Sequence, residues 1–171
     1  IINREKPAVW LFAGDSITHG AGHTFGYRSI SQIFEQYIKN ELGRGDDVVI
    51  NTGVSGATAA DQLTYSNERL LKYPADVVVI MLGTNDAAGE SHLIDVYRTN
   101  LEAIVDQVKA LGAIAVLRTP NPLRPADNGV RAVNLPEYAA VIRETAEKKG
   151  VLLIDHFAEW TEELETRSYL W

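Results

Sequence analysis

Five short apolar runs alternate along the chain with longer segments in which apolar and polar residues are mixed. Each run is almost continuous in Val, Ile, Leu and Ala, which is typical of strands that are covered on both faces. The pattern therefore predicts five buried strands, at residues 8–13, 47–50, 75–82, 113–117 and 151–154.

The longer segments have the three- or four-residue apolar spacing of amphipathic helices. The clearest covers residues 91–111 and ends at Gly112; another covers 135–149, where Asn134 can cap the helix and Pro136 falls in its first turn. Residues 119–133 contain three prolines and are predicted as a long loop. Further helices are predicted at residues 27–42, 59–71 and 157–164.

Strands and helices that alternate in this order predict an α/β fold with a parallel sheet. We expect a flavodoxin-like, three-layer α/β/α sandwich of about five parallel strands, forming a single domain over residues 1–171. Ligands of such sheets bind beyond the carboxyl ends of the strands, where the strand order reverses. The loops that follow the strands are therefore where chemistry is expected.

Composition narrows the possible partners. The 16 basic and 23 acidic residues give a net charge of −7, which argues against a nucleic-acid partner. The longest apolar stretch, 75–82, is far shorter than the roughly 20 residues that span a bilayer, so no membrane span is expected. The chain has no Cys, and its four histidines lack a ligand-like arrangement, so we expect no metal. Compartment and oligomeric state stay open.

Polar and glycine residues follow each of the first three predicted strands. The first strand leads into Gly14-Asp15-Ser16, the second into a loop with Gly53 and Gly56, and the third into the run 83–86, which contains Asn85. Each motif alone is compatible with an ordinary turn or helix cap. Because the carboxyl ends of parallel strands meet at one edge of a sheet, we expect the three loops to lie together.

The three loops together offer the parts of a site for acyl transfer. A serine at the start of a helix is a candidate nucleophile, and its own N–H lies where positive partial charge favours an oxyanion. The N–H of Gly56 and the neutral side-chain amide of Asn85 can donate to the same oxyanion. The serine needs a histidine base, usually oriented by a carboxylate.

The three motifs, in this order, resemble those of the SGNH (GDSL-like) hydrolase family. The resemblance covers nearly the whole chain, from residue 8 to about residue 154. It implies that Ser16 is the nucleophile and that the Ser16 N–H, the Gly56 N–H and the Asn85 side chain form the oxyanion hole.

The implied function is that of a serine ester hydrolase acting on a small acyl or acetyl ester through an acyl-enzyme intermediate. A carbohydrate acetyl ester and a lysophospholipid-like ester are both compatible with the resemblance, which implies no cofactor or metal. A flavodoxin-like nucleotide binder is the weaker alternative, because neither phosphate-binding glycine motif is present.

The chain departs from the family pattern at its end. The family carries an Asp-x-x-His pair after the last strand, and residues 155–171 do not contain it. His156 adjoins Asp155, but neighbouring residues on an extended strand point to opposite faces, so His156 is the less favoured candidate for the base. The other histidines are His19, His23 and His92.

We therefore expect that the domain in residues 1–171 lacks its Asp-x-x-His segment, which would lie beyond Trp171. The missing pair also supports a different class of function, a non-catalytic carbohydrate- or lipid-binding domain that keeps the hydrolase fold. Reaction of Ser16 with a fluorophosphonate would separate the two.

Overall fold

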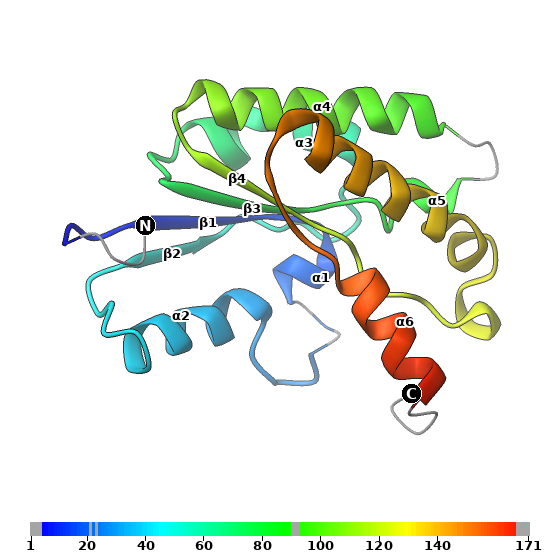
Figure 1. Ribbon diagram of the computed structural model, residues 1–171, viewed down its shortest axis with the longest axis horizontal. Coiled ribbons are helices and arrows are strands. Elements are labelled where there is room, and N and C mark those ends of the chain that lie inside the picture. The colour runs from blue at the N-terminus through cyan, green and yellow to red at the C-terminus, as the bar shows by residue number, and fades with distance from the viewer. Residues whose placement is uncertain (1–4, 21, 23, 90–92, 167–171) are drawn as a thin grey trace.

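The computed structural model describes residues 5–20, 22, 24–89 and 93–166. Its centre is a five-stranded sheet in which every neighbouring pair of strands is parallel, in the order β2-β1-β3-β4-β5 (Figure 1). The strands are β1 (Val9–Gly14), β2 (Val48–Asn51), β3 (Val77–Met81), β4 (Ile114–Arg118) and β5 (Leu152–Ile154). All five lie within two residues of the predicted runs, which confirms the expected α/β/α fold.

Burial along the strands follows their place in the sheet. The residues of β3 are all buried, and those of β1 are nearly so, because these strands lie inside the sheet and have helices on both faces. The strands β2 and β5 lie at the two edges and are more exposed. The strand order reverses between β1 and β3, so the crevice for ligands is expected at the carboxyl ends of these two strands.

Helices cover the sheet on both sides. In the view of Figure 1, α3, α4 and α5 lie above the sheet, and α1, α2 and α6 lie below it. The α-helices are α1 (Ser16–His19), α2 (Ile30–Asn40), α3 (Ala59–Thr64), α4 (Ile94–Ala110), α5 (Pro125–Lys149) and α6 (His156–Thr166). A π-helical turn, η1 (Asn67–Leu71), follows α3, and a 3-10 turn, η2 (Asp86–Ala88), follows β3.

Two apolar clusters hold these layers together. The larger lies between the sheet and the upper helices, where Leu101 and Ile104 of α4 and Ile142 of α5 pack on β3 and β4. The smaller lies on the other face and packs Ile38 of α2 against Trp10 and other residues of β1. Burial of apolar surface in the two clusters is the main force that holds the strand ends in fixed relative positions.

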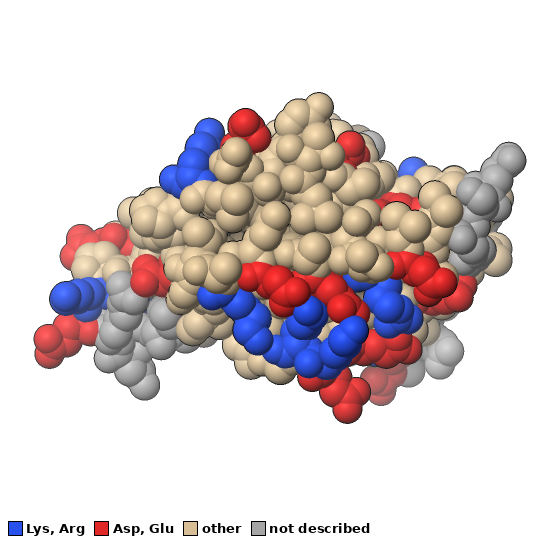
Figure 2. All heavy atoms as spheres, turned by 90° about the horizontal axis from the view of Figure 1, so that it is seen from above, with Lys and Arg blue, Asp and Glu red and all other residues tan. Residues whose placement is uncertain are grey.

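Ion pairs join the two long helices on the outer surface. Arg98 of α4 pairs with Glu144 of α5, and Lys148 and Lys149 of α5 pair with Glu102 and Asp106 of α4, respectively. Figure 2, seen from above, shows acidic and basic side chains side by side in a mixed band across this face of the molecule. Exposed pairs of this kind each contribute little stability, typically below about 1 kcal/mol.

The predicted loop at residues 119–133 is a helix over most of its length. Helix α5 begins at Pro125, continues across non-helical backbone at Gly129, and ends at Lys149. Asn134 therefore does not cap a helix as expected; it is buried, and its amide donates to the carbonyls of Ala87 and Gly89. Proline in the first helical turn was the misleading signal, because Pro136 lies well inside α5.

Helix α6 also begins one residue earlier than predicted, at His156. Asp155 and His156 thus stand at a strand-to-helix junction rather than on extended backbone. In the part of the chain that the structure describes, no helix is both long and apolar enough to cross a membrane.

Candidate active site

Ser16 is the first residue of α1, directly beyond the carboxyl end of β1. The side chain of Asp15 caps this helix by accepting the Ile17 N–H at 2.9 Å. Gly14 is required by close packing, since a Cβ there would lie 2.4 Å from both the Met81 carbonyl oxygen and Thr18 Oγ1. Asp15 and Gly14 thereby fix the tight turn that presents Ser16 above the sheet.

The loop after β2 lies against α1. The segment 53–57, called the Gly56 loop below, is joined to the β1 turn by the Val54 N–H, which donates to the Gly14 carbonyl at 2.9 Å. A Cβ on Gly53 would lie 2.5 Å from the His19 backbone nitrogen. Gly56 is exposed and has φ +83°, a left-handed conformation that glycine adopts without strain.

The loop after β3 contacts the Gly56 loop from the other side. Asn85 Nδ2 donates to the Ala57 carbonyl at 3.0 Å, and Asp86 Oδ1 accepts the Ala59 N–H at 2.9 Å. The structure therefore joins the loops of Ser16, Gly56 and Asn85 into one contiguous surface, as the sequence predicted. One amide hydrogen of Asn85 binds Ala57, which leaves the second for a ligand.

Two backbone donors at this surface have no internal acceptor. In the described residues, no hydrogen bond engages the N–H of Ser16 or of Gly56, and none engages Ser16 Oγ. Unpaired N–H groups at a helix start and in an exposed loop are suited to bind an anionic oxygen. The geometry thus supplies a hydroxyl together with nearby hydrogen-bond donors.

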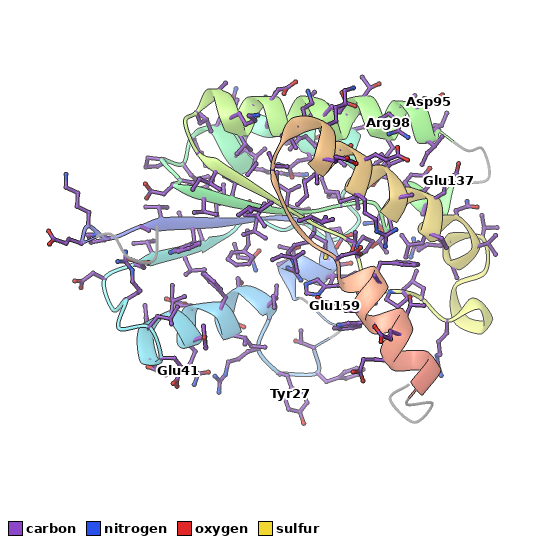
Figure 3. All side chains as sticks on the ribbon, viewed as in Figure 1. Tyr27, Glu41, Asp95, Arg98, Glu137 and Glu159 are labelled. Carbon is purple, nitrogen blue, oxygen red and sulfur yellow. The ribbon has the colours of Figure 1, made fainter. Side chains whose placement is uncertain are left out.

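The two histidines that the structure describes have other partners. His19 is exposed at the end of α1, with Nδ1 3.4 Å from Ser55 Oγ. His156 Nε2 accepts a hydrogen bond from Arg118 Nε at 3.1 Å, and its Nδ1 lies 3.6 Å from the carboxylate of Glu159, the α6 residue labelled in Figure 3. His23 and His92 lie outside the described residues.

Asp155 does not orient His156. Its carboxylate accepts from Arg143 Nε at 2.6 Å and from the Thr119 hydroxyl at 2.9 Å, and these bonds outweigh burial and lower the pKa of Asp155. Burial and the neighbouring Arg118 guanidinium lower the pKa of His156, which favours the neutral imidazole that accepts from Arg118. The expectation that the two residues do not act as a His–Asp pair agrees with these contacts.

Two carboxyl groups lie beneath the site. Asp15 is fully buried, and burial raises its pKa against the opposing effect of the Ile17 N–H. Burial likewise raises the pKa of Asp86, to about 6, and the charge of Asp15 adds to this rise. The buried guanidinium of Arg118 lies close enough to Asp15 to interact with it electrostatically. Burial thus favours the protonated form of both carboxyl groups relative to an exposed aspartate.

Comparison with known proteins identifies the family. The model described as the GDSL-like Lipase/Acylhydrolase family matches residues 12–171. The chain belongs to this family. The GDSL-like family is one of carboxylic ester hydrolases, and its match includes all three motifs that carried the resemblance.

Two curated relatives show how much of each protein is shared. The chain is 28% identical over 173 residues to an acetylxylan esterase of Geobacillus stearothermophilus, covering 91% of this chain and 79% of that one. It is 45% identical over 103 residues to an uncharacterized protein of Mycoplasma pneumoniae, covering 58% of this chain. The match spans only 12% of that much longer relative.

Solved structures agree with the GDSL-like fold. The crystal structure of the Geobacillus stearothermophilus acetylxylan esterase superposes with a TM-score of 0.76 at 25% identity, over 93% of this chain and 80% of that one. Catalytic variants of that esterase replace an aspartate, a histidine or a serine by alanine. Another acetyl xylan esterase matches with a TM-score of 0.80 at 21% identity, which shows the fold alone.

Several contacts that hold this GDSL-like site together carried no signal in the sequence. Asn51, at the end of β2, hydrogen-bonds to α1, and Asp86 holds the start of α3. Arg118 is the last residue of β4, and nothing in one sequence showed that it is buried and interacts electrostatically with Asp15. Such contacts join residues 27 to more than 30 positions apart, and local patterns do not report them.

Proposed function

We propose that this protein hydrolyses acetyl or other small acyl esters of carbohydrates, with Ser16 as the nucleophile. The observation that carries the proposal is the junction of three hydrogen-bonded loops, which bring Ser16, Gly56 and Asn85 to one surface; among the described residues, no hydrogen bond engages Ser16 Oγ or the N–H groups of Ser16 and Gly56. Family membership supports ester hydrolysis, and the acetylxylan esterases among the relatives support a carbohydrate acetyl ester.

In the proposed reaction, Ser16 Oγ attacks the ester carbonyl carbon and its proton passes to a general base. The carbonyl oxygen becomes an oxyanion, which accepts hydrogen bonds from the N–H groups of Ser16 and Gly56 and from Asn85 Nδ2. Collapse of this intermediate breaks the ester bond, and the general base returns its proton to the departing oxygen, which leaves as the neutral alcohol. Water then attacks the acyl-Ser16, releases the carboxylic acid and restores the serine.

We place the general base and its acid in an Asp-x-x-His segment beyond Trp171. The contacts of His19 and His156 support this placement, because neither described histidine has Ser16 among its hydrogen-bond partners. About a fifth of the Geobacillus stearothermophilus esterase has no counterpart in this chain, and catalytic variants of that esterase include an aspartate and a histidine. The proposal requires an intact protein heavier than residues 1–171.

Labelling with a fluorophosphonate tests the role of Ser16. The intact protein is expected to acquire one covalent adduct, detected by mass spectrometry, and Ser16→Ala to acquire none, because the adduct forms on the activated serine oxygen. Ser66 lies between α3 and η1, outside the three loops. Ser66→Ala therefore serves as the matched control and should be labelled like the wild type. Labelling of Ser16→Ala at the wild-type rate would show that another residue reacts.

The same protein and variants then separate the substrate classes. Release of acetate from acetylated xylo-oligosaccharides, faster than release of fatty acid from a lysophospholipid, is the expected result. The opposite order would assign the protein to lipid esters. Sugar binding without labelling or hydrolysis would instead support the non-catalytic binding domain.

A further inference from the structure

Asn51 is the last residue of β2 and makes three hydrogen bonds with its side chain. Its Nδ2 donates to the Thr18 carbonyl at 2.8 Å and to Ser31 Oγ at 2.9 Å, and its Oδ1 accepts the Gly53 N–H at 2.9 Å. The residue stands at an exposed edge strand, yet Thr18 and Ser31 are both buried. Its amide therefore links the Gly56 loop to two helices.

Each of the three bonds fixes a different part of the site. Thr18 belongs to α1, so its carbonyl is one of the end carbonyls that a short helix leaves unpaired. Ser31 lies in the first turn of α2 and contacts Ser29 Oγ at 3.1 Å, and Ser29 forms the capping box of that helix. The bond to Gly53 sets the direction in which the Gly56 loop leaves the strand.

The Gly56 loop is thereby held at both ends. Asn51 fixes its beginning against α1, and Asn85 fixes its end through the Ala57 carbonyl. Between these two bonds, Gly56 is exposed, and a Cβ placed on it would meet no atom within 4 Å. The position of the Gly56 N–H relative to Ser16 therefore depends on these two ends of the loop and on the Val54 N–H bond to the Gly14 carbonyl, not on packing around the glycine itself.

We propose that Asn51 is a positioning residue for the oxyanion hole, which holds the Gly56 N–H at the correct distance from Ser16. This inference rests on the proposed function, because it assigns a role within the same reaction. A side-chain amide suits the position, since it offers two donors and an acceptor at once. A carboxylate in its place would turn an oxygen toward the Thr18 carbonyl.

The rate at which a fluorophosphonate labels Ser16 separates this role from a merely structural one. A displaced oxyanion donor weakens stabilisation of the transition state but not ground-state binding, so the maximal labelling rate should fall while half-saturation stays constant. Displacements of about 1 Å at catalytic groups cost up to about 100-fold in rate. We expect Asn51→Ala to label about 10- to 100-fold more slowly than the wild type at saturating fluorophosphonate.

Thr52→Val is the matched control. Thr52 is the neighbouring residue, and its hydroxyl donates to the Arg69 carbonyl at 2.9 Å and lies 3.3 Å from the Phe12 carbonyl, away from α1 and the Gly56 loop. Its removal should lower the melting temperature without changing the labelling rate. Asn51→Asp, which keeps the acceptor for the Gly53 N–H, should also slow labelling and decides the question if Asn51→Ala does not fold.

The outcomes distinguish this inference from the proposed function. Slow labelling of both Asn51 variants, with an unchanged half-saturation constant and wild-type rates for Thr52→Val, supports the positioning role. Labelling of the Asn51 variants at the wild-type rate, or equal slowing by Thr52→Val, overturns the positioning role alone. A wild-type protein that is not labelled overturns the proposed function, and the inference falls with it.

Discussion

The carboxyl group of Asp86 holds the start of α3 next to the site, and it lowers the unfolding free energy of the protein when it is ionised. Its Oδ1 accepts the Ala59 N–H, while its Oδ2 is buried and has no hydrogen-bond partner among the residues that the structure describes. Burial raises the pKa of Asp86 to about 6. A rise of about two pKa units corresponds to about 3 kcal/mol of unfolding free energy, lost when the group ionises in the folded state.

The sign of the pH dependence follows from this raised pKa. Between about pH 4 and 6 the folded protein holds a proton on Asp86 that the unfolded chain has released, so lowering the pH through this window stabilises the fold. The unfolding free energy of the wild type relative to Asp86→Asn should therefore increase by about 2–3 kcal/mol from pH 7.5 to pH 4. Urea unfolding of both proteins across this range measures the difference. Asp95→Asn, on the exposed start of α4 (Figure 3), is the control; parallel curves for Asp86→Asn and the wild type would refute the assignment.

At the scale of elements, α1 and the Gly56 loop pack against each other with backbone close to backbone. A Cβ at Gly53 would approach three backbone atoms of Thr18 and His19 within 2.5–3.0 Å, and backbone cannot move aside as a flexible side chain can. Gly53→Ala should thus lower the unfolding free energy by about 1–3 kcal/mol and slow the labelling of Ser16, since loop and helix must separate. Gly45→Ala has open space around it and should change neither quantity, so equal effects of the two substitutions on labelling and thermal unfolding would contradict this account.

Elements were predictable from sequence where burial alone determines them. The inner strands are apolar runs because both faces of the sheet are covered there, and that cause acts on every residue of β3 and on all but the first of β1. The start of α5 was missed because Pro136 and Asn134 are typical of a helix start, whereas tertiary contacts put Asn134 to use inside the helix. Local signals decide an element only when no distant group competes for the same side chain.

At the scale of the whole molecule, the sequence predicted that the three loops meet but not the contacts that support them. The loops of Ser16, Gly56 and Asn85 were predicted to meet because parallel strands end at one edge, and the structure joins them. The supporting contacts of Asn51 and Asp86 depend on the register of β2 against β1 and on the placement of α3, which residue patterns do not specify. The catalytic roles themselves stay predictions until labelling tests them.

At the amino ends of the strands, opposite the candidate site, hydrogen bonds stabilise the fold. Just before β2, the buried carboxylate of Asp47 accepts hydrogen bonds from the Ala8 N–H, from Trp10 Nε1 and from Arg44, which tie the starts of β1 and β2 together. Burial raises the pKa of Asp47, but these donors, Arg44 foremost, outweigh it and lower the pKa to about 2. Because the folded-state pKa lies below the unfolded value of 3.8, the stabilisation is complete above about pH 4 and is lost as the pH falls through about 2.

Asp47→Asn should therefore destabilise the protein by about 2 kcal/mol at pH 7, since the change of nearly two pKa units sets that magnitude. The difference from the wild type should shrink progressively below pH 4, which guanidinium unfolding at pH 7, 4 and 2.5 measures. Labelling of Ser16 at 25 °C should be unchanged, because the substitution lies at the amino ends of the strands and the site at their carboxyl ends. A labelling rate that falls in proportion to the loss of stability would contradict this expectation. It would show that the amino and carboxyl ends of the strands are coupled, so that the rigidity of the site depends on the stability of the whole fold.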